Sequence, residues 1–89
     1  MHAVVVRVSI SDQESAQKGL TEMVVPRVSK APGFVAGYWT RADDGSNGLS
    51  MIVFESEDAA RAAAERIGTN VPDGVTFEGA EIREVAASA

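Results

Sequence analysis

Residues 49–64 read LSMIVFESEDAARAAA, and this stretch decides the fold. Its first part, 49–55, has the pattern of a strand with apolar residues on both faces. Met51 and Val53 point one way, and Ile52 and Phe54 point the other. Ser56 then supplies a hydroxyl N-cap, and the acids that follow it stand where the helix dipole is positive. The alanines that continue toward Gly68 favour a helix lying close against a sheet. The stretch therefore predicts an apolar strand that leads directly into a helix.

Outward from this stretch, the chain supplies three more strands and one more helix. We expect the strands at 2–10, 34–41 and 75–85, and the helix at about 12–30. A capping box of Ser11 and Glu14 is expected to begin this helix. Pro26 is expected to kink or restart it, because proline has no amide hydrogen to donate. In the last strand the apolar alternation breaks at Gly79, which predicts a β-bulge there.

The element order is β-α-β-β-α-β, which predicts an α+β, ferredoxin-like fold. Right-handed crossovers place both helices on one face of a four-stranded antiparallel sheet, with the first and third strands in the centre. The other face of the sheet is then uncovered, although it carries apolar residues such as Val5 and Val35. An uncovered apolar face on so small a domain predicts a partner, and the simplest partner is a second copy related by a two-fold axis.

Composition narrows the possible functions. The 89 residues suit a single domain, 1–89, and the chain has no cysteine and one histidine, His2. Neither a thiolate metal site nor a histidine-rich metal site can form, so we expect no metal and no cofactor. The net charge is −5, and the basic residues are scattered along the sequence. A role on nucleic acid or on a membrane surface is therefore disfavoured.

No targeting or membrane signal stands out. The N-terminal apolar run is interrupted by Arg7 and lacks the basic start and the cleavage site of a signal peptide. No apolar stretch approaches the ~20 residues of a membrane-spanning helix. We expect a cytoplasmic protein.

One class of β-α-β-β-α-β domain binds RNA through aromatic residues on its first and third strands. The corresponding third-strand positions here are Leu49 and Met51, and the first strand has no aromatic residue. Bases have no ring to stack on at these positions, so RNA recognition is disfavoured.

Two stretches resemble a known superfamily. Residues 31–41, APGFVAGYWTR, and 52–59, IVFESEDA, are similar to the dimeric α+β-barrel proteins, the antibiotic biosynthesis monooxygenase-like superfamily. The resemblance implies a homodimer whose two sheets pack face to face into a barrel. It also implies relatives that include cofactor-independent monooxygenases of phenolic polyketides, haem-degrading enzymes and small proteins of unknown role.

The haem-degrading members use an asparagine on the first strand, a tryptophan near the end of the third strand and a histidine on the second helix. The corresponding places here hold Val5 or Arg7, Phe54, and a helix without histidine. These departures count against haem degradation. The phenol-oxidising members are associated with Asn, Trp, Tyr and Arg near the substrate, but no residue of this chain can be matched to them position by position. No catalytic residue is therefore assigned.

Three residues are candidates for binding a ligand: Trp39, Arg7 and Tyr38. Trp39 could be a platform for an aromatic ligand, or an aromatic residue of the barrel interior or dimer interface. Tyr38 alternates with Trp39 and shares the face of Phe34, so we expect it to pack beneath the helices. Arg7 lies in the middle of a central strand, where its charge needs solvent or a partner. That partner is either an anionic ligand or a carboxylate across the dimer.

Two functions fit these observations. The first is a homodimeric, cofactor-independent oxygenase acting on a small electron-rich aromatic molecule. The second is a non-catalytic dimeric module that binds a ligand or only assembles. A pocket of at least ~300 Å³ lined by Trp39 or Arg7 would favour the first function, and a fully packed interior would exclude it.

Overall fold

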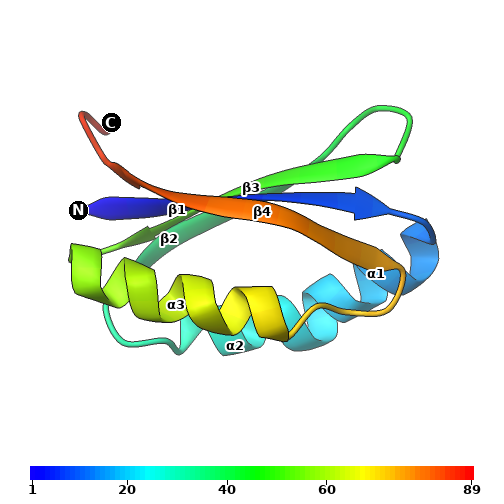
Figure 1. Ribbon diagram of the computed structural model, residues 1–89, viewed down its shortest axis with the longest axis horizontal. Helices are drawn as coiled ribbons and strands as arrows, with labels where there is room; N and C mark the ends of the chain where they lie inside the picture. The colour runs from blue at the N-terminus through cyan, green and yellow to red at the C-terminus, as the bar shows by residue number, and fades with distance from the viewer.

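The computed structural model describes all of residues 1–89 and has the predicted layered architecture. Its elements are β1 (His2–Ile10), α1 (Gln13–Gly19), the π-helical segment η1 (Leu20–Val24), α2 (Val25–Ser29), β2 (Phe34–Arg41), β3 (Asn47–Phe54), α3 (Glu57–Thr69) and β4 (Val75–Glu84). The strands form one antiparallel sheet in the order β2-β3-β1-β4, with β1 and β3 in the centre. Figure 1 shows the helices on one face of this sheet and no element on the other face. The ferredoxin-like α+β fold is thereby confirmed.

The helix expected at about 12–30 is divided into three parts. The break begins a full turn before Pro26, where the amide of Val25 donates to the carbonyl of Leu20, five residues back. Pro26 has no amide hydrogen for the carbonyl of Glu22. A widened π turn ahead of the proline lets the chain continue as α2 without that hydrogen bond.

The start of α1 differs from the prediction. The N-cap is Asp12, whose carboxylate accepts from the Ser15 amide at 3.2 Å and from the Ser15 hydroxyl at 3.0 Å. These hydrogen bonds lower the pKa of Asp12 below its usual value. The capping box is wrong because Ser11 is held elsewhere: its amide donates to the carbonyl of Gly74 at 2.8 Å. At α3 the predicted cap is confirmed, since the Ser56 hydroxyl accepts from the Ala59 amide at 3.1 Å.

An unpredicted bulge in β2 changes which residues face the helices. Phe34 pairs with Phe54 and Ala36 pairs with Val53, so Val35 between them has no partner. Trp39 thereby comes to the same side as Phe34, and Tyr38 points to the uncovered side with 70% of its surface exposed. The expectation that Tyr38 packs beneath the helices is therefore wrong.

The bulge predicted in β4 is present. Arg7 pairs with Gly79 and Val8 pairs with Phe77, which leaves Glu78 unpaired. The extra residue lets Phe77 and Ile82 both pack against the core between sheet and helices.

The core lies at the end of the sheet where β3 leads into α3. Its buried members are Val4, Val6, Ile52, Phe54, Ala60 and Ala63. Phe34 packs edge-on against Phe54, with ring centroids 6.2 Å apart and an interplanar angle of 79°. The small side chains of α3 let this helix lie directly on the sheet, so the core is closed at this end.

The uncovered face of the sheet exposes apolar side chains. Val35, Tyr38, Leu49 and Met51 each keep 45% or more of their surface exposed. None of the helices is long and apolar enough to cross a membrane.

Candidate functional site

A cavity of about 640 Å³ lies between the helices and the sheet. It is half open to solvent, and 16 of the 26 residues that line it are hydrophobic. Its walls come from β1, β2, β3, β4, all three helices and the π segment. The volume falls within the range of about 300–1,000 Å³ that small-molecule sites occupy.

The cavity exists because the two helical segments rest differently on the sheet. α3 packs against β4, β1 and β3, and α2 packs against β2. In contrast, α1 and η1 pack mainly along their own helical segment, and both contribute to the wall of the cavity. Leu20, Met23 and Val24, all in η1, line it. π-helical turns are frequently found at functional sites, and here the widened turn borders the largest hollow of the molecule.

Trp39 lines this cavity, and a glycine fixes how it lies. A Cβ atom added to Gly37 would come within 2.7 Å of Cη2 of the indole, which is closer than real Cβ contacts allow. The indole therefore lies against the backbone of its own strand, with Phe34 next to it. A flat aromatic surface is thus presented to the cavity, as a platform for an aromatic ligand requires.

Ser50 is the one polar residue among the buried side chains, and it also lines the cavity. It pairs with Trp39 across β2 and β3, so the two side chains stand next to each other on the helix side of the sheet. No hydrogen bond ties its hydroxyl to another group of the protein, and the oxygen is not sealed from the cavity. Ser50 therefore offers a hydroxyl donor and acceptor beside Trp39.

The other two candidates from the sequence lie on the opposite face of the sheet. Arg7 is exposed there, with its guanidinium over Gly79, where Nη2 would be 3.1 Å from an added Cβ. It lines a shallow hollow with Ser9 and Glu78, whose side chains share a hydrogen bond of 2.6 Å. Tyr38 is exposed on the same face. The structure thus separates Trp39 from Arg7 and Tyr38 by the thickness of the sheet.

Residues that the sequence did not single out complete the cavity. Four basic residues line it: Arg27, Lys30, Arg41 and Arg66. The Arg41 guanidinium donates to the amide oxygen of Gln17 at 2.8 Å, which ties the end of β2 to α1. Arg27 and Lys30 are three residues apart and so share a face of α2. This spacing was a visible signal, but only the folded topology brings Arg66 of α3 to the same cavity.

No group of three or more His, Asp or Glu side chains is placed to hold a metal ion. The acids at the start of α3 have other partners: Glu57 accepts from Arg61 at 2.8 Å, and this hydrogen bond lowers the pKa of Glu57. The cavity can therefore bind by apolar contact, hydrogen bonding and positive charge.

No protein-family model and no curated protein matches the sequence. Among solved structures, the chain is similar to the crystal structure of a monooxygenase from the gene ActVA-Orf6 of Streptomyces coelicolor, in complex with the ligand nanaomycin D. The TM-score is 0.61 and the sequences are 18% identical, over 98% of this chain and 89% of that chain. The chain therefore has the antibiotic biosynthesis monooxygenase-like fold that its sequence resembles.

Proposed function

We propose that this protein binds a small aromatic molecule in the cavity between its helices and its sheet. The observation that carries the proposal is the cavity itself: about 640 Å³, mostly hydrophobic, and lined by Trp39. Binding sites for small molecules combine apolar walls with a few polar groups, and Ser50 is such a group beside the indole. The sequences's pocket criterion is met by Trp39 and not by Arg7.

Calorimetric titration with 2-naphthol, a neutral aromatic probe, tests the proposal. Val24→Phe adds a ring to the cavity wall, and Thr21→Phe adds the same ring at an exposed position of the same π segment. We expect the wild type and Thr21→Phe to bind equally, and Val24→Phe to lose about tenfold or more in affinity, equivalent to ~1.4 kcal/mol. Equal binding by both variants would place the ligand elsewhere.

Oxidation of the bound aromatic molecule is a second candidate function. The similar structure is that of a monooxygenase, which makes such a reaction worth testing here. In the reaction considered, a phenol and dioxygen give a quinone and water. One oxygen atom enters the ring, the other leaves as water, and the substrate supplies all four electrons. The cavity's positive charge would favour the ionised phenol, which gives up electrons more readily, so the protein contributes positioning and electrostatics.

Oxygen uptake separates the two candidates. If the protein oxidises its ligand, oxygen consumption with a bound phenol exceeds the uncatalysed rate, and labelled dioxygen puts one labelled atom into the product. If uptake stays at the uncatalysed rate while binding is intact, the protein is a non-catalytic binding module.

The proposal also includes a homodimer formed through the uncovered sheet face. In support, Val35, Tyr38, Leu49 and Met51 are exposed on that face. Light scattering should give twice the chain mass of 9.3 kDa. Met51→Glu should give a monomer, because it places a charge in the apolar face. Ala62→Glu, exposed on α3, should leave the mass unchanged. A monomeric wild type at micromolar concentration would refute the dimer and leave the cavity proposal standing.

A further inference from the structure

The charges of this protein are unevenly distributed. The chain carries 13 acidic and 8 basic residues. Four of those 8 basic residues line the cavity, and no aspartate or glutamate does. An acidic protein thus surrounds its largest hollow with positive charge alone.

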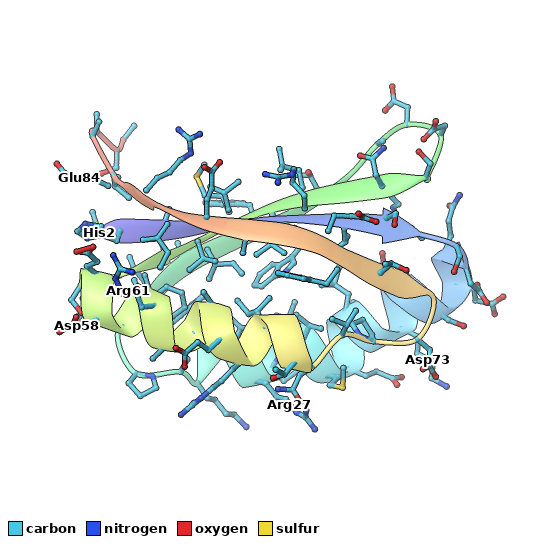
Figure 2. The ribbon with its side chains drawn as sticks, viewed as in Figure 1. His2, Arg27, Asp58, Arg61, Asp73 and Glu84 are labelled. Atoms are coloured by element: carbon cyan, nitrogen blue, oxygen red, sulfur yellow. The ribbon has the colours of Figure 1, made fainter.

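The cavity's basic residues are also free of carboxylate partners. The two ion pairs of the molecule, Arg61–Glu57 at 2.8 Å and Arg83–Glu81 at 3.0 Å, lie outside the cavity. Arg41 has a neutral partner in the Gln17 amide and keeps its full charge. Figure 2 shows Arg61 beside Asp58 at the end where α3 begins, whereas Arg27 lies on the outer side of the helix layer. Within 4 Å, therefore, no carboxylate of the chain neutralises Arg27, Lys30 or Arg66.

The placement of these cations matches the shape of the cavity. Arg27 and Lys30 come from α2 and its C-cap, and Arg66 comes from α3, so they border the hollow from both helical segments. All three side chains are exposed and stand at the opening, while the interior is formed by hydrophobic residues, Trp39 and Ser50. Low-dielectric walls behind a positive rim strengthen the attraction of an anion.

We infer that the ligand is an amphipathic anion: an aromatic body that fills the cavity and one acidic group, such as a carboxylate, held at the opening by Arg27, Arg66 and Lys30. This inference rests on the proposed function, because it names the chemical class of the molecule that the cavity takes. Guanidinium groups bind carboxylates through charge-assisted hydrogen bonds, often with two donors at once. The rim would then give selectivity, and the apolar walls would give most of the affinity.

A matched pair of probes isolates the acidic group. 2-Naphthoate and methyl 2-naphthoate have the same aromatic body, and only the first is charged at neutral pH. We expect calorimetry to show the acid binding roughly threefold to tenfold more tightly than the ester, since each partner guanidinium is partly exposed. The preference should shrink as salt rises, because exposed charges are screened.

Charge-removing variants locate the site. Arg27→Gln and Arg66→Gln should each weaken naphthoate binding by about threefold and leave ester binding unchanged. The double variant should remove the preference. Arg61→Gln is the matched control, since Arg61 is on the same helix as Arg66 but outside the cavity. It should bind both probes as the wild type does.

The outcomes distinguish this inference from the proposed function. If acid and ester bind the wild type equally, the inference is overturned and the cavity remains a binding site for neutral aromatics. If the double variant keeps the preference for the acid, the anion is held elsewhere and the inference is again overturned. If neither probe binds, the proposed function fails and the inference fails with it.

Discussion

The two ends of the helix–sheet layer differ in how they are packed. Where β3 leads into α3, Val4, Phe54 and Ala60 are completely buried. Where β1 leads into α1, Leu20, Val75 and Phe77 are only half-buried and face the cavity. We call these regions the closed end and the hollow end. A domain of 89 residues has little apolar surface to spare, so leaving one end unpacked sacrifices dispersion contacts that a closed core would have.

Backbone features explain the difference. At the closed end, alanines of α3 allow the helix to approach the sheet, and the bulge at Val35 turns Phe34 onto Phe54. At the hollow end, the π turn before Pro26 interrupts the other helical segment. The comparison teaches that stability resides at one end of the layer and the binding space at the other. Four predictions follow this division, from the largest effect to the smallest.

Phe54→Ala should cost the most. The ring is fully buried at the closed end and packs against Phe34, so its removal leaves a void that the sheet cannot collapse to fill. We expect the free energy of unfolding to fall by about 3–5 kcal/mol, measured by urea denaturation at fixed protein concentration. A loss below that of a hollow-end substitution would contradict the division.

Leu20→Ala is the matching substitution at the hollow end. Leu20 is half-buried and already borders empty space, so truncation removes only part of a buried side chain's transfer free energy. The expected loss is about 1 kcal/mol in the same denaturation experiment. A loss as large as that of Phe54→Ala would mean that the cavity is closed in solution.

Ser50→Ala should separate stability from binding. Because the hydroxyl has no protein partner, the variant should unfold within about 0.5 kcal/mol of the wild type. Its affinity for 2-naphthol should fall by roughly fivefold, which corresponds to one lost hydrogen bond of ~1 kcal/mol. If the stability loss instead exceeded the binding loss, Ser50 would be a structural residue.

Asp12→Asn should produce the smallest effect, and one that depends on pH. Asp12 caps α1 at the hollow end, and its pKa is lowered by the hydrogen bonds from Ser15. A lowered pKa in the folded state means that the ionised carboxylate stabilises the fold above its unfolded pKa, near 4, and that this contribution disappears as the pH falls through the folded pKa.

Thermal unfolding at two pH values checks this prediction. The wild type should be slightly more stable than Asp12→Asn at pH 7, and the two should converge near pH 3, since asparagine also caps helices. Ser56→Ala at the closed end removes a cap that does not titrate, so its deficit should be similar at both pH values. A deficit of Asp12→Asn that persisted at pH 3 would show that the charge is not what matters.

Local sequence rules predicted the fold, but they did not predict the site. The strand-to-helix junction at 52–59 and the break of alternation at Gly79 are read within a few residues, and both are present. The bulge at Val35 has no comparable signal, because a valine is ordinary in a strand. Its effect was large, since one extra residue reverses the faces of Tyr38 and Trp39.

The rim of the cavity illustrates a second limit. Arg27, Lys30 and Arg66 looked scattered in the sequence and are brought together only by the packing of α2 and α3 around the cavity. Whether a helix packs tightly or stands away from a sheet depends on small shifts of the backbone. Periodicity does not record such shifts.

Chemical-shift mapping by NMR tests the central claim most directly, because the chain is small and Trp39 is its only tryptophan. On titration with 2-naphthoate, the Trp39 indole and the amides of Ser50, Leu20 and Arg66 should shift together. Met51 and Val5, on the uncovered face, should remain in place. Shifts centred on Met51 and Val5, with the Trp39 indole unmoved, would contradict a ligand site between the helices and the sheet.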